Sequence, residues 1–218
     1  MIATRHDFAN RDALAAGLAN RVARGLSNTM SRQGDATLAV SGGTTPTLFF
    51  EHLSRKPITW EKVTVTLVDE RQVDEDSMRS NARLVRQNLL QSQAKAAKFV
   101  PLFQNELVAS ALDIDVVVLG MGDDGHTASF FPGGDRLAEA LNMKTTSALL
   151  PMQAPNAGEP RLTFTLPALL KAKVLCLHIE GERKHAVLEK AMAGTDVLDM
   201  PIRAVLQSDH PLDIFWCP

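Results

Sequence analysis

Apolar side chains recur at helical spacing near the N-terminus and then give way to a short apolar run. Leu14, Leu18, Val22 and Leu26 follow one another at intervals of four residues, which predicts a helix with one buried face. Residues 37–40 are mostly apolar and run into a pair of glycines, which predicts a strand that ends in a tight turn. The first two expected elements are therefore a helix and a strand.

The same alternation continues through the middle of the chain. Residues 63–68 are rich in β-branched side chains and predict a second strand. Ala82, Val85 and Leu89 mark one face of the helix expected after it. Residues 116–119 are apolar throughout, which is typical of a strand covered on both faces of a parallel sheet. This order of elements indicates an α/β protein.

The second half of the chain repeats the alternation less regularly. Further strands are predicted at residues 161–165, 174–179 and 212–216. Residues 182–193 predict a helix, whereas residues 151–160 are proline-rich and predict a surface loop. With 45% hydrophobic residues, a chain of 218 residues can bury one substantial core. We expect residues 1–218 to form a single domain, with a mostly parallel sheet flanked by helices and room for a small additional lobe.

Charge and cysteine content narrow the possible partners and compartment. Lysine and arginine number 23 and aspartate and glutamate 25, giving a net charge of −2 without the basic block that nucleic-acid or membrane binding normally needs. Cys176 and Cys217 form no CxxC pair, so neither a disulfide framework nor a cysteine zinc site is indicated. Residues 1–7 lack the apolar core of a signal peptide, and no stretch has the length of a membrane helix. We expect a cytoplasmic protein that binds neither nucleic acid nor membrane; its oligomeric partner is not defined by the sequence.

Ligands of open parallel sheets bind beyond the carboxyl ends of the strands, which directs attention to three segments. These segments are residues 41–46, 69–71 and 120–132.

The first segment has the composition of a phosphate cradle. Small residues let backbone N–H groups approach an anion, the following helix presents its positive end, and hydroxyl groups add donors. The residues expected to bind phosphate here are Ser41, Gly42, Gly43, Thr44 and Thr45. Thr45 is also predicted to cap the next helix and Pro46 to open it. The structural alternative is a turn that needs glycines for geometry alone. The segment is not a Walker loop, because no lysine follows the glycines at the required place.

The third segment contains a GxGxxG match at residues 120–125, the pattern of a dinucleotide-binding oxidoreductase. Two features oppose that interpretation. Asp123 and Asp124 would bring negative charge toward a pyrophosphate, and Pro132 would interrupt a helix that begins at this turn. A redox enzyme or a simple sugar-phosphate binder therefore ranks behind hydrolytic chemistry.

His126 follows an apolar strand on a polar loop, with Asp124 close enough in sequence to orient its ring. Such a pair can activate water. The other histidines are expected to fill surface or core positions; they are His6, His52, His178, His185 and His210. No convincing ligand spacing for a metal ion is found, so we expect neither a metal nor a cofactor.

These motifs together resemble the 6-phosphogluconolactonase family, which shares its fold with the glucosamine-6-phosphate deaminases. The matching segments extend along most of the chain and comprise residues 41–46, 68–71, 80–81, 120–132, 161–167 and 181–184. The resemblance implies a Rossmann-like α/β fold and hydrolysis of 6-phosphoglucono-1,5-lactone to 6-phosphogluconate without a redox cofactor, with His126 as the catalytic base. The expected partner is thus a small sugar-phosphate lactone.

The triplet Asp124-Gly125-His126 is shared with the deaminases and cannot distinguish the two activities. The deaminase segment resembles His-Ile-Ala-Phe-Asn-Glu-Pro, with an acidic residue five positions after the histidine, where this chain has Phe131. Arg71 is a second difference, because deaminases tend to carry an aromatic residue after the matching Asp-Glu pair. We rank lactone hydrolase first, sugar-phosphate deaminase or isomerase second, and the dinucleotide enzyme or simple binder third.

Four further side chains are expected to bind the substrate phosphate or hydroxyl groups: Asp69, Arg71, Arg161 and Lys184. The alternative for the cationic ones is a solvated surface charge. Backbone N–H groups of the glycine-rich loops are expected to stabilise the oxyanion, without the sequence identifying which.

Overall fold

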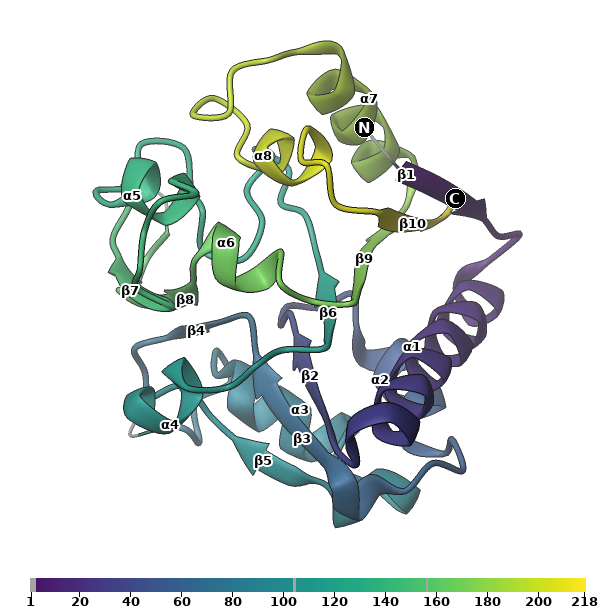
Figure 1. The fold of residues 1–218 in the computed structure, drawn as a ribbon. Coiled ribbons are helices and arrows are strands. Elements are labelled where there is room, and N and C mark those ends of the chain that lie inside the picture. Colours follow the sequence, from purple (N-terminus) through teal and green to yellow (C-terminus); the bar gives the residue numbers. More distant parts are fainter. Residues whose placement is uncertain (1–2, 104, 156) are drawn as a thin grey trace.

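Seven parallel strands form the central sheet of the computed structural model, which describes residues 3–103, 105–155 and 157–218 (Figure 1). In chain order they are β1 (Ala3–Asp7), β2 (Ala36–Val40), β3 (Val63–Leu67), β5 (Lys98–Val100), β6 (Val116–Leu119), β9 (Val174–Glu180) and β10 (Leu212–Cys217). Their spatial order is β1-β10-β9-β6-β2-β3-β5, and every neighbouring pair is parallel. The predicted α/β fold with a mostly parallel sheet is confirmed.

Helices connect and cover the strands. They are α1 (Arg11–Gln33), α2 (Thr47–Ser54), α3 (Asn81–Asn88), α4 (Glu106–Ser110), α5 (Leu137–Leu141), α6 (Leu166–Leu169), α7 (Glu182–Ala193) and α8 (Ile202–Leu206), with short 3₁₀ turns at Trp60–Lys62 and Ser92–Ala96. Helix α1 packs on α2 and on strands β2, β6, β9 and β10, while α7 contacts α8 and β9 (Figure 1). No helix of the described residues is long and apolar enough to cross a membrane.

The strand order creates a switch point in the middle of the sheet. From β2 the chain moves outward through β3 to β5, and then returns to β6 on the other side of β2. The loops after β2 and β6 therefore diverge from adjacent strand ends, which is where open α/β sheets form ligand crevices.

A second, antiparallel sheet of three strands lies beside the first (Figure 1). It consists of β4 (Asp69–Arg71), β8 (Arg161–Phe164) and β7 (Leu149–Met152). Only Val68 separates β3 from β4, and the Val68 carbonyl accepts a hydrogen bond from the Phe164 N–H at 2.9 Å. The chain thus carries Asp69 and Arg71 directly from the main sheet into the smaller one.

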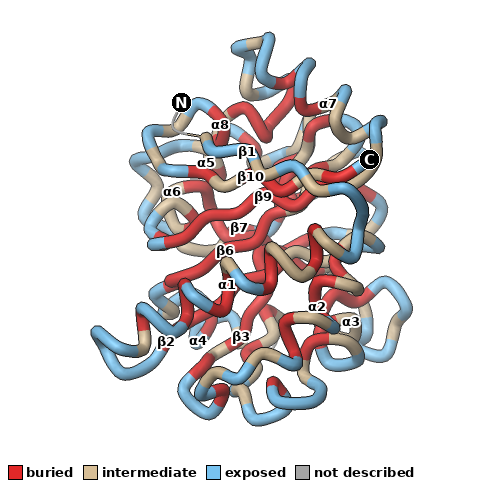
Figure 2. Tube along the Cα trace, turned by 90° about the vertical axis from the view of Figure 1, so that its right-hand side faces the viewer, coloured by how far each residue is buried: buried red, intermediate tan, exposed pale blue. Residues whose placement is uncertain are grey.

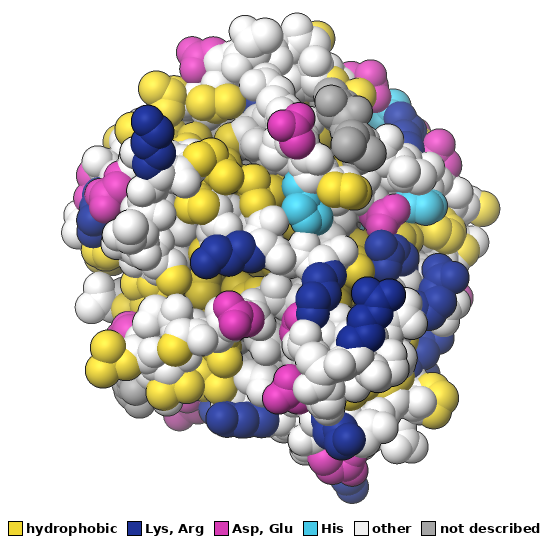
Figure 3. Space-filling model, viewed as in Figure 1, with side chains coloured by type: hydrophobic (Ala, Val, Ile, Leu, Met, Phe, Trp, Pro, Cys, Tyr) yellow, Lys and Arg dark blue, Asp and Glu magenta, His cyan; other side chains and the backbone are white. Residues whose placement is uncertain are grey.

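One hydrophobic cluster spans both sheets. It includes Leu38 and Val118 of the main sheet as well as Leu162 and Phe164 of the smaller one. Figure 2 shows the buried part of the trace running through the middle of the molecule, with exposed loops around it. On the face drawn in Figure 3, acidic and basic side chains lie next to one another, in keeping with a net charge of −2.

Most predicted elements are present, with a few corrections. The predicted cap at Thr45 is wrong: α2 begins at Thr47, and Pro46 is the cap residue, already in helical conformation and without a side-chain cap. The predicted loop at residues 151–160 is partly wrong, because its first two residues belong to β7; residue 156 lies outside the described residues.

Candidate active site

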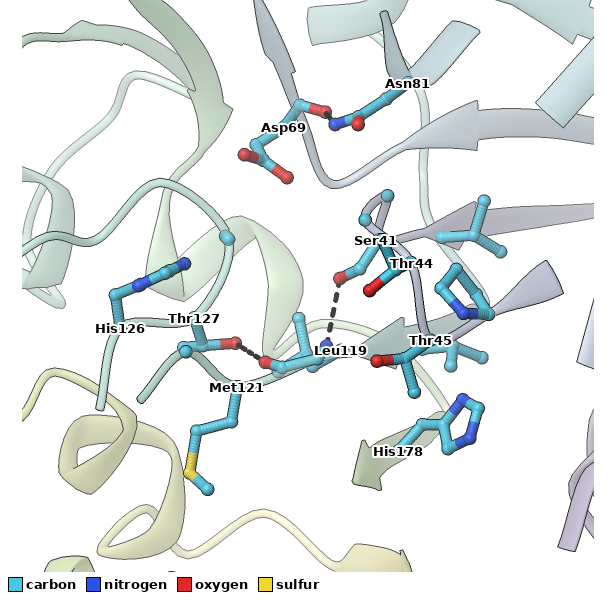
Figure 4. A pocket seen from close by; sticks show the side chains of 18 of the residues that line it. Ser41, Thr44, Thr45, Asp69, Asn81, Leu119, Met121, His126, Thr127 and His178 are labelled. Carbon is cyan, nitrogen blue, oxygen red and sulfur yellow. Dashed lines mark hydrogen bonds between the residues drawn. The ribbon is translucent and has the colours of Figure 1, made fainter. Parts of the chain in front are cut away.

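A pocket of about 370 Å³ opens at the switch point of the main sheet (Figure 4). Loops after β2 and β6 contribute to its wall, together with residues of β4, β8, β9 and α7. Of the residues predicted from the sequence, those that line it are Ser41, Gly42, Gly43, Thr44, Thr45, Asp69, Arg71, His126, Arg161 and Lys184. Asp124 does not line the pocket itself, but it is paired with His126, which does. Segments distant in sequence therefore meet in one cavity.

The loop after β2 presents free backbone donors to this cavity. None of the described residues accepts a hydrogen bond from the backbone N–H groups of residues 42–45. Gly43 adopts a φ of 96°, which an L side chain rarely takes, and a Cβ on Gly42 would lie 1.8 Å from Asn81 Oδ1. The Ser41 hydroxyl accepts a hydrogen bond from the Gly120 N–H at 3.1 Å and so ties this loop to the one after β6. A run of unpartnered N–H groups on residues that line a pocket suits an anion.

His126 and Asp124 form a tight pair on the loop after β6. His126 Nδ1 lies 2.6 Å from Asp124 Oδ1, and the same oxygen accepts a hydrogen bond from the His126 backbone N–H at 3.1 Å. Burial raises the pKa of Asp124, but the hydrogen bonds and charge of His126 outweigh it and bring that pKa to about 2. Asp124 is therefore ionised at neutral pH and favours the tautomer in which Nδ1 carries the proton.

The close approach of this pair depends on Gly122. A Cβ at Gly122 would lie 2.1 Å from His126 Nδ1 and 2.6 Å from Asp124 Oδ1. The Gly122 N–H also donates to the His126 carbonyl at 2.8 Å, which closes the loop behind the ring. The glycine thus makes room for the histidine that follows it.

An aromatic ring separates His126 from a buried arginine. The rings of Phe131 and His126 lie 4.4 Å apart between centroids, and the Arg161 guanidinium lies 5.2 Å from the Phe131 centroid. At this sequence position, where the deaminase-type segment has an acidic residue, an apolar ring thus lies against His126.

Two arginines and one aspartate come together from the smaller sheet. Arg161 Nη1 lies 3.7 Å from Asp69 Oδ2, which also accepts a hydrogen bond from the Ser129 hydroxyl at 2.6 Å. Burial lowers the pKa of Arg161, and the charge of Asp69 raises it in part. Arg71 donates to the Arg79 carbonyl and to Asn81 Oδ1, at 2.6 and 3.1 Å. The Nε atoms of Arg71 and Arg161 are buried without a partner among the described residues.

Lys184 reaches the pocket from the first turn of α7. Its Nζ lies 2.7 Å from Asp123 Oδ1, and Arg183 pairs with the other oxygen of Asp123 at 2.8 Å. Asp123 thus interacts with α7, while the adjacent Asp124 interacts with His126.

Glu70, which lies between two pocket residues in sequence, has a different role. Its carboxylate accepts hydrogen bonds from the backbone N–H groups of Arg71, Asn81 and Ala82, at 2.7, 2.9 and 2.7 Å. It therefore binds the start of α3 and is not a pocket residue.

Several pocket residues were not singled out as ligands from the sequence. Asn81 lies within a matched motif, but its contact with Gly42 depends on the fold. His178 and Glu180, assigned no role from the sequence, line the pocket from β9. The available signal was their spacing of two residues in a predicted strand, which places both side chains on the same face of that strand. Among the described residues, no group of three or more His, Cys, Asp or Glu side chains is arranged to hold a metal ion.

The fold and the pocket together define a class, an α/β protein with a histidine–aspartate pair and basic side chains at the switch point. A family model described as glucosamine-6-phosphate isomerases/6-phosphogluconolactonase matches residues 9–216, and the chain belongs to this family.

Similar proteins carry the name of one branch of the family. The chain is 51% identical to a 6-phosphogluconolactonase of Rhizobium meliloti, with 100% of both chains covered. It is likewise 51% identical to one of Mesorhizobium japonicum, over 97% of this chain and 94% of the relative. The crystal structure of a 6-phosphogluconolactonase from Shewanella baltica superposes with a TM-score of 0.94 at 39% identity, covering 100% of both chains.

Proposed function

We propose that this chain is a 6-phosphogluconolactonase, which hydrolyses 6-phosphoglucono-1,5-lactone to 6-phosphogluconate in the pentose phosphate pathway. The observation that carries the proposal is the 2.6 Å pair of His126 and Asp124, which opens on the same pocket as the unpartnered donors of residues 42–45. The relatives named above support the same reaction.

His126 acts as the general base in this proposal. Asp124 accepts the Nδ1 proton, so Nε2, which has no partner among the described residues, is free to take a proton from water. The water oxygen then bonds to the lactone carbonyl carbon. As the tetrahedral intermediate collapses, the bond to the ring oxygen breaks and the imidazolium returns the proton to that oxygen. Asp124 stabilises the transient imidazolium.

The phosphate occupies the basic end of the pocket. N–H groups of residues 42–45 donate to phosphate oxygens, together with the hydroxyls of Thr44 and Thr45. Arg161 and Lys184 supply charge-assisted hydrogen bonds, and Arg71 extends the cationic wall. Asp69 is an acceptor for a sugar hydroxyl. These assignments predict that unphosphorylated gluconolactone is a poor substrate.

Phe131 favours hydrolysis over deamination. A deaminase must open an amino-sugar ring, move protons and expel ammonia, whereas lactone hydrolysis needs one activated water and one stabilised alkoxide. The apolar ring packed against His126 cannot provide an additional proton-transfer group.

The direct test is incubation of the purified protein with enzymatically generated 6-phosphogluconolactone. Acid release is followed and the spontaneous rate is subtracted. We expect marked acceleration with this substrate, little with gluconolactone, and no ammonia from glucosamine 6-phosphate. Release of ammonia without lactone hydrolysis would replace this proposal with the deaminase.

A further inference from the structure

The pocket contains a second histidine–carboxylate pair. His178 of β9 is only 3% exposed, lines the pocket and lies on the side of Thr45 in Figure 4. Its Nε2 lies 3.0 Å from Glu180 Oε1, and its ring meets the edge of Phe49 at 6.1 Å between centroids. One nitrogen of this ring is thus occupied by a carboxylate.

The other nitrogen is available from the pocket. Nδ1 of His178 has no hydrogen-bond partner among the described residues. Unlike the buried, unpartnered Nε atoms of Arg71 and Arg161, this nitrogen is not sealed from solvent. Because the residue lines the pocket and is otherwise buried, Nδ1 is reached from the cavity.

We propose that His178 is a phosphate ligand that binds as an imidazolium, with Nε2–H donating to Glu180 and Nδ1–H donating to the substrate phosphate. This inference rests on the proposed function for the presence of a phosphate in the pocket. In a neutral ring whose Nε2–H donates to Glu180, Nδ1 carries no proton. Its lone pair would then face the anion. Contact with a phosphate therefore requires a second proton on the ring.

The charges around His178 permit this protonation. Glu180 lies on the same strand and also pairs with Arg11 of α1 at 3.1 Å, which leaves its other oxygen for His178. Lys184 of α7 and the arginines Arg71, Arg79 and Arg161 line the same pocket, and their positive charges oppose a charge on the ring. The ring that contacts His178 from α2 is the uncharged Phe49, and the register partner on β10 is Phe215, whose ring stacks on His6 of β1. Glu180 on one side of the ring and a bound phosphate dianion on the other favour the imidazolium.

Proton uptake is the consequence that a merely structural histidine would not produce. Where the free ring is neutral, binding of phosphate draws a proton from solvent. Affinity for the phosphorylated ligand should then fall as pH rises, beyond any change due to the phosphate itself.

The test is calorimetry of 6-phosphogluconate and of gluconate binding to wild type and His178→Gln, in two buffers with different ionisation enthalpies. At about pH 8 we expect the wild type to take up more protons with 6-phosphogluconate than the variant does. The variant should bind 6-phosphogluconate about 10- to 100-fold more weakly and gluconate unchanged. His52→Gln is the matched control, because it loses a comparable pair with Asp12, 2.9 Å away, outside the pocket.

Equal proton uptake in wild type and variant would overturn the inference, as would equal weakening for both ligands. Should His178→Gln fail to fold, Glu180→Gln retains an acceptor for Nε2–H and removes the charge, so proton uptake must fall in it too. The proposed function is tested separately. If the wild type binds 6-phosphogluconate with proton uptake but does not hydrolyse the lactone, the proposed hydrolase activity is wrong, whereas the role of His178 as a phosphate ligand stands. A wild type without affinity for 6-phosphogluconate overturns the inference.

Discussion

Arg71 and Arg161 are register partners across the antiparallel strands β4 and β8, and both side chains line the pocket. Like charges directly opposite each other on neighbouring strands are unfavourable, so this pair costs stability unless an anion lies nearby. Asp69 offsets part of the charge at 3.7 Å from Arg161. A bound anion in the pocket that both arginines line would offset the rest of this charge.

Replacement of Arg161 by lysine keeps the charge and removes the planar fork of donors. We expect Arg161→Lys to raise KM for the phosphorylated lactone about 10-fold or more, with a smaller change in kcat, because binding of the phosphate is lost in ground and transition state alike. Steady-state kinetics check this. Arg136→Lys, which alters an ion pair with Glu139 elsewhere, is the control. An unchanged KM would remove Arg161 from the phosphate site.

Glu70 provides a stability prediction separate from catalysis. In Glu70→Gln, one carboxylate oxygen becomes an amide NH₂ that faces backbone N–H donors at the start of α3. A buried unsatisfied donor costs about 1–3 kcal/mol, and a chain of this size loses about 2–4 °C in Tm per kcal/mol. Thermal unfolding should therefore show a clear decrease, absent in the exposed control Glu51→Gln.

Periodicity predicted the buried elements, because a face packed on a core leaves a repeat in the sequence. Helix α1 and strands β2 and β6 were found in this way. Strand β1 has polar, partly exposed positions, and β5 is only three residues long, so neither leaves such a repeat. Strand β7 contains Pro151, which argues against a strand unless the position lies at an edge, as it does here.

The site was more predictable in its motifs than in its contacts. The loops of residues 41–46 and 120–132 follow the two strands that flank the switch point, so their meeting could be expected. The pairing of Arg71 with Arg161 could not, because it depends on the chain entering a second sheet at Asp69. His178 resembled an ordinary buried histidine, since nothing in the sequence shows that its strand ends beside Thr45.

The single hydrophobic cluster shared by both sheets supports the proposal that residues 1–218 unfold as one unit. Leu162 and Phe164 of β8 belong to the same cluster as the main-sheet strands, so the smaller sheet should not separate first. We expect circular dichroism and tryptophan fluorescence to give coincident thermal transitions. Two resolved transitions would indicate that the smaller sheet folds independently.

Substitution of Gly122 should lower activity as strongly as substitution of a catalytic residue, although Gly122 does not touch the reacting atoms of the substrate. The Cβ of Gly122→Ala would lie 2.1 Å from His126 Nδ1, so the ring must leave its bond with Asp124. We expect kcat to fall about 10²-fold or more while the fold is retained. Gly120→Ala is the control, since its Cβ meets only Ser41 at 3.9 Å. Equal, small losses in the two variants would show that the pair tolerates displacement.

His126 is the residue on which the proposed chemistry depends. His126→Asn removes the base from a loop position that contributes little to the core, so folding should persist while kcat falls by roughly 10²–10⁴. Affinity for 6-phosphogluconate should change much less, because the phosphate ligands lie on other elements. Circular dichroism and binding calorimetry on the variant distinguish loss of chemistry from loss of structure.

The pH profile provides the second measurement on the same base. Only a neutral imidazole accepts a proton, so the wild-type rate should decrease toward acid pH. The pKa of Asp124 is lowered to about 2, so this carboxylate stays ionised throughout and the decrease reports the ring. Spontaneous lactone hydrolysis accelerates with base and must be subtracted at every pH. If folded His126→Asn retains near wild-type turnover, His126 is not the base, and Asp69 and Asp124 are the carboxylates to replace next.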